Sequence, residues 1–400
     1  MVFTLGGVCP LNGAFLRSVN YYLHTLGGLI MSNTIKIKEV KAFIELLGKA
    51  VAAASSKIDS IMSGVMVVAE GDEINIRGTD SSISVEASGK EITETAEQVS
   101  FVVPAKIFLD MMKKLPKGDV ELAMEENRLD IKVGKSTYGI STMDCDQYPK
   151  PLQVEEGTTF KVEGTMFAES LACVAHATAD NETRPILTGV HVLSNGKYLT
   201  LIATDSHRLS AKAVPLLAET EEFANVVLPK SAVKEITSIL SDTDEVEFSI
   251  TQNQLACRTE GLVFATRLIE GTYPDVTRLI PNEFENEVVV HRDEFLKALD
   301  RTKVALGKDK VATFRVVSGT LPTLNIECKT EITNIFEELF VDEAGSNDLS
   351  IKLNVHYLID GLNSMNSKKI RLQFSGALKP MLLKPEIEGS TQFGLLLPVR

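Results

Sequence analysis

Near the middle of this 400-residue chain, Asp205, Ser206 and His207 follow one another and supply the residue types of a hydrolase triad. Neighbouring side chains on a strand point to opposite faces, so three consecutive residues cannot form the required relay of hydrogen bonds. The G-x-S-x-G sequence of a nucleophile elbow is also absent from the chain. These residues therefore predict a polar cluster at the end of a strand and no catalytic residue.

Two other groups of residues resemble known sites only superficially. Gly134-Lys135-Ser136 is similar to the end of a phosphate-binding loop, but it lacks the upstream glycine and lies between two strand patterns, which predicts a hairpin. Asp144, Cys145 and Asp146 could be metal ligands by type, but they lie at a repeat boundary where a connecting turn is expected. We therefore expect no metal site and no cofactor.

The composition restricts the class of protein. Hydrophobic residues make up 44% of the chain, and no apolar run approaches the roughly 20 residues of a membrane helix, so no membrane partner is expected. Five cysteines lie far apart, which argues against disulfides and favours a cytoplasmic location. The net charge of −13 argues against a protein that grips nucleic acid tightly, but permits a local basic lining inside an acidic exterior.

The chain contains an internal repeat of 125 residues. Asp80 and Asp205 follow a threonine at this spacing, Pro104 and Pro229 each follow an apolar run, and the same offset relates Tyr148-Pro149 to Tyr273-Pro274. A fainter third copy surrounds Asn354. Repeats of this size indicate copied domains, and we expect three, at residues 31–154, 155–282 and 283–400.

Each repeat combines apolar residues at helical spacing with segments of alternating polarity. Phe43 and Leu47 belong to one predicted helix, and a second is expected after Pro104, because proline is tolerated where a helix begins. Strands with period-two alternation lie between the helices. The predicted class is α+β: three repeated domains of antiparallel sheets, each with two helices on one face.

Basic residues are expected on the exposed faces of these helices. Such lysines are common on any solvated helix, but three copied domains in an arc would turn the same helical face inward, and head-to-tail association of two chains would close a ring. The candidate inner residues are Lys41, Lys114, Lys230, Lys234, Lys297 and Arg301.

Residues 1–30 differ from the rest, with one basic and no acidic residue. Gly27-Gly28 precedes Met31 at a distance that would suit a ribosome-binding site in the coding sequence. We expect Met31 to be the natural start and residues 1–30 to be a translated leader; a disordered extension is the alternative.

Specific motifs resemble those of bacterial DNA sliding clamps, the beta subunit of DNA polymerase III. Residues 203–209 (ATDSHRL) are similar to the family's A-T-D-G-H-R-L, residues 184–190 to R-P-x-L-x-G-V, residues 270–275 (EGTYPD) to E-G-x-[FY]-P-D, and residues 398–400 to its terminus. The resemblance covers Met31 to Arg400. It implies a non-enzymatic processivity factor that closes as a head-to-tail homodimer around duplex DNA.

The resemblance also implies partners and sites. The replicative polymerase, a clamp loader and other clamp-motif proteins are expected to dock short peptides between the second and third domains. The matching pocket positions are Leu187, Thr204, Ser206, His207, Arg208, Leu209, Pro274, Leu279, Asn354, Tyr357, Leu378, Leu395, Leu397, Pro398 and Val399. By analogy, Arg77 and Arg184 join the inner lysines as DNA contacts, and Phe108 and Leu306 are expected at a dimer interface between the first and third domains.

Ser206 stands where the family usually has glycine, and the chain ends at Arg400 where many relatives carry one more apolar residue. A left-handed backbone at position 206 would cost a serine about 1 kcal/mol, so the sequence leaves the shape of this turn open. Two other functions also stay open: a clamp-like peptide scaffold that does not encircle DNA, and an enzyme on a repeated fold. Oligomeric state and retention on circular DNA separate the clamp from the scaffold.

Overall fold

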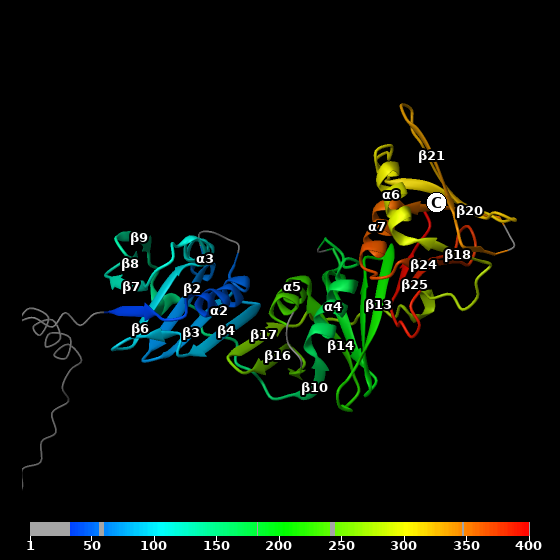
Figure 1. Ribbon diagram of the computed structural model, residues 1–400. Helices are drawn as coiled ribbons and strands as arrows, with labels where there is room; N and C mark the ends of the chain where they lie inside the picture. Colours follow the sequence, from blue (N-terminus) through cyan, green and yellow to red (C-terminus); the bar gives the residue numbers. More distant parts are fainter. Residues whose placement is uncertain (1–32, 56–59, 182, 241–244, 346–347, 400) are drawn as a thin grey trace, which may run out of the picture.

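The computed structural model describes residues 33–55, 60–181, 183–240, 245–345 and 348–399, which form three consecutive domains (Figure 1). The proposed leader lies outside these residues. The first domain contains β1 (Thr34–Ile37), α2 (Val40–Ala52), β2 (Gly64–Glu70), β3 (Glu73–Thr79), β4 (Ile83–Lys90), β5 (Thr93–Glu94), β6 (Val99–Pro104), α3 (Ala105–Lys114), β7 (Val120–Glu125), β8 (Arg128–Val133) and β9 (Ser136–Ser141).

The second and third domains repeat this order with small changes. The second contains β10 (Thr158–Glu163), α4 (Gly164–Ala175), β11 (Gly189–Ser194), β12 (Tyr198–Thr204), β13 (Arg208–Pro215), β14 (Phe223–Pro229), α5 (Lys230–Ile239), β15 (Glu245–Ile250), β16 (Gln254–Thr259) and β17 (Leu262–Arg267). The third contains β18 (Asn286–His291), α6 (Arg292–Lys303), β19 (Val311–Val317), β20 (Thr323–Lys329), β21 (Asn334–Phe340), β22 (Glu343–Ala344), β23 (Leu349–Asn354), α7 (Val355–Asn363), β24 (Lys369–Phe374), β25 (Met381–Pro385) and β26 (Phe393–Leu396).

The helices form where the apolar spacing predicted them. In α2, Phe43, Leu47 and Ala50 are fully buried and lie on one face at helical spacing. Pro104 and Pro229 immediately precede α3 and α5 as their N-cap residues, where the missing N–H leaves no hydrogen bond unmade. Gly134 lies in the β8–β9 hairpin with φ of 57°, which confirms the predicted turn at Gly134-Lys135-Ser136.

Phe108 does not lie at a surface, and its prediction as a dimer contact is wrong. Its side chain is fully buried in the first domain, and its ring packs edge-on against those of Phe43 and Phe101 at centroid distances of 6.1 and 6.2 Å. The residue that precedes it on α3, Ile107, is 56% exposed. Helical spacing correctly identified the apolar stripe that contains Phe108, and the separate expectation that Phe108 contacts a second chain is the part that fails.

The domains are joined by continuous sheets. An eight-stranded sheet runs in the order β10-β15-β16-β17-β4-β3-β2-β6, so β17 of the second domain pairs with β4 of the first, with Phe264 opposite Val85. A nine-stranded sheet runs β14-β11-β12-β13-β26-β25-β24-β18-β22, and places Leu209 of the second domain opposite Leu395 of the third. Antiparallel backbone hydrogen bonds therefore cross both domain junctions.

Two sheets end without such a neighbour. The first domain contributes the order β5-β1-β7-β8-β9, and the third contributes β21-β20-β19-β23. By position in the repeat, β9 corresponds to β17, and β21 corresponds to β4 and β13. Among the described strands, β9 and β21 thus each keep an unpaired edge. Their counterparts β17, β4 and β13 instead pair with a strand of the neighbouring domain.

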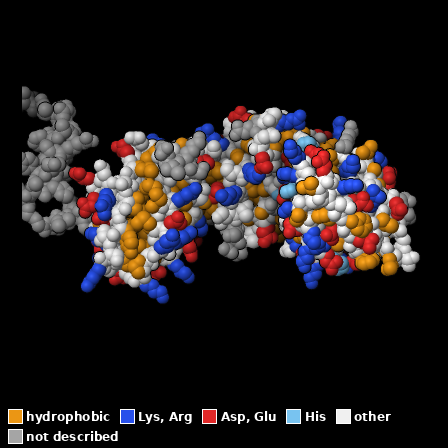
Figure 2. All heavy atoms as spheres, turned by 90° about the horizontal axis from the view of Figure 1, so that it is seen from above, with side chains coloured by type: hydrophobic (Ala, Val, Ile, Leu, Met, Phe, Trp, Pro, Cys, Tyr) orange, Lys and Arg blue, Asp and Glu red, His pale blue; other side chains and the backbone are white. Residues whose placement is uncertain are grey.

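The three domains follow an arc, with the helices along its concave side and the sheets outside (Figure 1). The six α-helices of the described residues, α2 to α7, all contribute to this side. Figure 2 shows the molecule from above this arc, with lysine and arginine side chains over all three domains and acidic side chains between them. The predicted α+β class and the placement of the helices on one face are confirmed.

Candidate functional site

The turn between β12 and β13 is held by its own side chains. The hydroxyl of Thr204 donates a hydrogen bond to the carbonyl oxygen of Arg208 at 2.6 Å. Asp205 Oδ1 accepts from the backbone N–H groups of His207 and Arg208 at 2.9 and 3.0 Å. Ser206 adopts a φ of 77°, which is a left-handed conformation. The Asp205 carboxylate therefore closes the turn by accepting hydrogen bonds from the backbone, which is the structural role expected for this cluster.

Arg208 extends from this turn across the junction to the third domain. Its Nε lies 2.9 Å from Asp205 Oδ2, and its Nη1 lies 2.5 Å from Asp360 Oδ2 on α7. Its guanidinium carbon also lies 4.3 Å from the centre of the Tyr357 ring. Because the side chain is only 9% exposed, two carboxylates and a ring face hold it in one orientation.

A pocket of about 560 Å³ opens beside Arg208 at this junction. Five of the predicted pocket residues line it: Leu187, Ser206, His207, Arg208 and Tyr357. Its rim also includes Arg184, which was predicted as a DNA contact, and the segment 178–181, which was not predicted to belong to the pocket. The rings of His207 and Tyr357 lie nearly parallel at a centroid distance of 6.4 Å. The pocket thus combines planar and charged groups from two domains.

An apolar cluster supports the pocket from behind. Leu187, Leu209 and Leu395 are buried in it together with Tyr273, and Leu397 packs against it. The hydroxyl oxygen of Tyr273 accepts a hydrogen bond from the backbone N–H of Thr204 at 3.1 Å. Tyr273 therefore fixes the turn. The repeat spacing between Tyr148 and Tyr273 did not predict this role.

The other predicted pocket residues have different positions. The side chain of Asn354 caps α7 by accepting from the N–H groups of His356 and Tyr357. Pro274 and Leu279 are exposed on the loop that follows Tyr273, and Leu378 is 73% exposed in the turn between β24 and β25. Pro398 and Val399 lie in the segment after β26, where the N–H of Val399 donates to the carbonyl oxygen of Lys352 at 2.9 Å.

A buried histidine, His191, and a partly buried one, His176, lie in the second domain. Burial lowers the pKa of His191 to about 4, and its ring stacks on Tyr273 at a centroid distance of 4.5 Å. Neither ring nitrogen of His191 has a hydrogen-bond partner. Burial, with the positive charge of Arg208 as a smaller cause, also lowers the pKa of His176 to about 4. Both imidazoles are therefore neutral in the folded protein at neutral pH.

The predicted inner basic residues are exposed. Lys41, Lys114, Lys234 and Lys297 lie on α2, α3, α5 and α6. Lys230 pairs with Asp180 at 2.8 Å, and Arg301 makes two hydrogen bonds with Glu337, at 2.8 and 2.6 Å. Arg77 differs because it lies on β3, is partly buried and pairs with Glu86 at 2.9 Å. Leu306 is partly buried against the core of the third domain.

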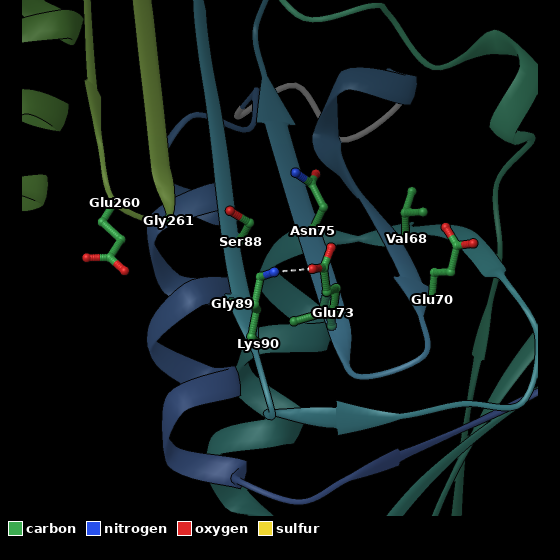
Figure 3. Close-up of a pocket in the computed structure, with 10 residues that line it drawn as sticks. Val68, Glu70, Glu73, Asn75, Ser88, Gly89, Lys90, Glu260 and Gly261 are labelled. Atoms are coloured by element: carbon green, nitrogen blue, oxygen red, sulfur yellow. Dashed lines mark ion pairs between the residues drawn. The ribbon is translucent and has the colours of Figure 1, made fainter.

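A second groove lies at the other junction, on the sheet side (Figure 3). Its lining includes Glu70, Glu73, Lys90 and Glu260, and Lys90 forms an ion pair with Glu73 that Figure 3 marks. None of the predicted site residues lines this groove.

No group of three or more His, Cys, Asp or Glu side chains that could hold a metal occurs among the described residues. Asp144 instead caps a single turn, Cys145–Gln147. Across all the residues that the structure describes, no helix is long and apolar enough to cross a membrane.

Three repeated α+β domains joined edge to edge, with their helices on one side, define the sliding-clamp type of fold. Family models of the DNA polymerase III beta subunit match its N-terminal domain to residues 36–152, its central domain to 161–275 and its C-terminal domain to 277–400. The chain therefore belongs to the bacterial sliding-clamp family, whose members are non-enzymatic processivity factors.

Individual relatives agree with this membership. The beta sliding clamp of Bacillus subtilis strain 168 is 32% identical over 350 residues, covering 85% of this chain and 92% of the relative. That of Staphylococcus epidermidis RP62A is 33% identical over 349 residues, with the same coverage. The crystal structure of the B. subtilis sliding clamp is similar with a TM-score of 0.83 at 29% identity, covering 92% of this chain and 99% of that one. The beta chain from Streptococcus pneumoniae gives 0.85 at 28% identity, with equal coverage.

Proposed function

We propose that two copies of this chain close head to tail around duplex DNA and hold a replicative polymerase on its template. The observation that carries this proposal is the pair of unpaired edges, β9 and β21, at the two ends of the arc. Their counterparts join the domains at both internal junctions. Pairing β9 with β21 of a second chain would repeat the same junction twice more and leave neither of these two edges open.

The side chains at these edges support the ring. Tyr138 is the third residue of β9 and is 36% exposed, whereas Phe264, the third residue of β17, is 1% exposed in the core beside its β4 partner Val85. Tyr138 lines a hollow of about 380 Å³ with Ile107 and Met111 on α3. Such an apolar hollow is typical of a surface that a second protein covers.

The opposite edge offers matching groups. Ile335 and Leu339 of β21 are only partly buried and belong to the face that packs against α6. By analogy with the pairing of Phe264 and Val85, Tyr138 would lie across from Ile335 of the second chain. Leu306, which is partly buried against the core of the third domain, is a further proposed contact of this interface.

Within the ring, the exposed lysines of the concave side would meet phosphates loosely and without reading the base sequence. Because the chain carries a net charge of −13, DNA would be favoured only on this lining. A polymerase peptide docked in the pocket beside His207 and Tyr357 would raise the effective concentration of polymerase at the template. The proposal has three further parts. A separate ATP-driven clamp loader would load the ring, other clamp-motif proteins would dock in the same pocket, and the protein would act in the cytoplasm.

Sedimentation equilibrium over micromolar dilution tests the ring first. We expect a dimer of twice the 43.7-kDa chain mass. The dimer, loaded with a clamp loader, should then be retained on circular duplex DNA and lost when the DNA is cut. A strict monomer at every concentration would contradict the ring and favour the alternative, a peptide-binding scaffold that does not encircle DNA.

A further inference from the structure

Asp360 contacts the pocket only through another residue. It lies on α7 in the third domain, its side chain is 45% exposed, and its Oδ2 accepts from Nη1 of Arg208 in the second domain. Asp360 is not among the residues that line the pocket, whereas Arg208 and Tyr357 are. The Asp360 carboxylate thus holds a side chain that faces the pocket from a position outside it.

The other junction of the same chain shows what the joint alone requires. A spacing of 125 residues relates Arg208 to Ile83, Tyr357 to Ala232 and Asp360 to Glu235. Ile83 and Ala232 are buried in one apolar cluster, and β4 pairs with β17 there over five residues. The junction of the first two domains is therefore built from a strand ladder and apolar contacts, with an isoleucine in place of the arginine.

Glu235 makes the contrast sharper. It is buried, and burial, with the negative charge of Asp80 as a smaller cause, raises the pKa of its carboxyl group. An acid at this position of the helix is thus present at both junctions, but only the second junction supplies an arginine and a tyrosine to meet it. The cluster of Arg208, Asp360 and Tyr357 is therefore not needed to join two domains, and it occurs only at the junction that carries the pocket.

The geometry assigns Arg208 a fixed place between two domains. Asp205 holds its Nε, Asp360 holds its Nη1, and the Tyr357 ring lies on its guanidinium face at 4.3 Å. Losing the Asp360 charge would leave one end of the guanidinium without its ionic partner and free the Tyr357 ring to move. A bound peptide would then have to order both side chains, which costs binding free energy.

We propose that Asp360 is a positioning residue for the peptide pocket, acting by locking Arg208 against Tyr357 across the domain junction. The proposal rests on the proposed peptide-docking function. Its consequence is that peptide affinity depends on a carboxylate that the peptide does not touch, while the joint itself does not depend on it.

The test compares three variants of the full-length chain, Asp360→Asn, Asp360→Glu and the matched Glu235→Gln at the other junction. The probe is a fluorescein-labelled synthetic peptide copied from the clamp-binding segment of the same organism's replicative polymerase, followed by fluorescence anisotropy and stopped-flow dissociation. We expect Asp360→Asn to weaken binding about tenfold, mainly through faster dissociation. Glu235→Gln should leave binding unchanged, and Asp360→Glu should restore most of the affinity because it keeps the charge.

Sedimentation and thermal unfolding of the same samples separate positioning from stability. The proposal is supported if Asp360→Asn keeps the mass and unfolding midpoint of the unmodified chain while losing affinity. It is overturned if the unmodified chain binds the peptide and Asp360→Asn binds equally well, or if Glu235→Gln loses as much affinity. If the unmodified chain itself does not bind, the peptide-docking function fails, and this inference fails with it.

Discussion

Ser81 and Ser206, 125 residues apart, share a left-handed backbone with φ of 77°. The surrounding hydrogen bonds are also the same: Thr79 donates to the carbonyl of Ile83 at 2.7 Å, and Asp80 Oδ1 accepts from the N–H groups of Ser82 and Ile83 at 3.0 and 2.8 Å. A serine therefore adopts the same left-handed conformation in both copies of the turn. The threonine and aspartate side chains impose the turn, and serine bears the strain.

Replacing Ser206 by glycine should stabilise the second domain. A left-handed serine costs about 1 kcal/mol, and part of this gain is offset because glycine makes the unfolded chain more flexible. We expect Ser206→Gly to raise the midpoint of thermal unfolding slightly, and Ser81→Gly to act in the same direction. As a control, Ser238→Gly on the exposed face of α5 should lower the midpoint, since glycine is unfavourable inside a helix. A lower midpoint for Ser206→Gly would contradict the strain.

The dimer proposal predicts a specific effect of charge on β9. Tyr138→Asp would place a carboxylate in the apolar hollow that the second chain is expected to cover. The dimer dissociation constant measured by sedimentation should rise at least about a hundredfold, which corresponds to a loss of about 2.8 kcal/mol. Tyr198→Asp is the matched control, because Tyr198 is 47% exposed on β12 at no sheet edge. Equal effects of the two changes would reject the interface.

The lowered pKa values of His191 and His176 predict a loss of stability in acid. The pKa of His191 is lowered by burial from 6.5 to about 4, so the unfolded chain takes up a proton below pH 6.5 that the folded chain does not. The contribution of neutral His191 to the free energy of unfolding is complete above pH 6.5 and is lost as the pH falls towards 4. His176 has the same sign and the same window.

Replacing His191 by phenylalanine tests this linkage. The substitution keeps a ring against Tyr273 and removes two buried nitrogens that have no hydrogen-bond partner. We expect the variant to be more stable at pH 5 than the unmodified chain, and its chemical denaturation midpoint to depend less on pH between 6.5 and 4. An unchanged profile for His191→Phe would show that another group causes the acid transition.

Leu279 was predicted to belong to the pocket but does not line the hollow beside Arg208, and its exposed side chain can be changed without unfolding the domain. Leu279 is 43% exposed, whereas Leu209 is 2% exposed and lies in the ladder that joins the second and third domains. Leu279→Asp should weaken binding of the polymerase peptide at least about tenfold with little change in the unfolding midpoint. Leu209→Asp should instead lower the unfolding midpoint, because it buries a charge. Normal peptide affinity in Leu279→Asp would remove this residue from the pocket.

The sequence predicted the architecture because the repeat and the apolar periodicity are local signals. Only the family resemblance grouped Leu187, His207, Arg208 and Tyr357, which line one hollow in the structure, because that hollow is built by two of the three domains. The role of Asp360 could not be predicted, because its contact with Arg208 spans 152 residues of sequence. Phe108 was misassigned for a related reason: periodicity identifies an apolar stripe but not which residue another chain covers.

The helical lining finally predicts that two neighbouring basic residues differ in their contribution to DNA binding. Lys297 and Arg301 lie one turn apart on α6, and Arg301 already donates two hydrogen bonds to Glu337. Those hydrogen bonds lower the pKa of the Glu337 carboxyl group, which therefore stays charged and neutralises Arg301. No ion pair involves Lys297 among the described residues.

Lys297→Ala should therefore reduce DNA binding more than Arg301→Ala. Losing one phosphate contact lowers the slope of log K against log salt by about 0.9, whereas loss of an arginine that is already neutralised should leave the slope nearly unchanged. The slope is measured by titrating a short labelled duplex with each variant at several salt concentrations. Equal slopes for the two variants would mean that Arg301 exchanges Glu337 for phosphate when DNA is enclosed, and would place the two residues on an equal footing.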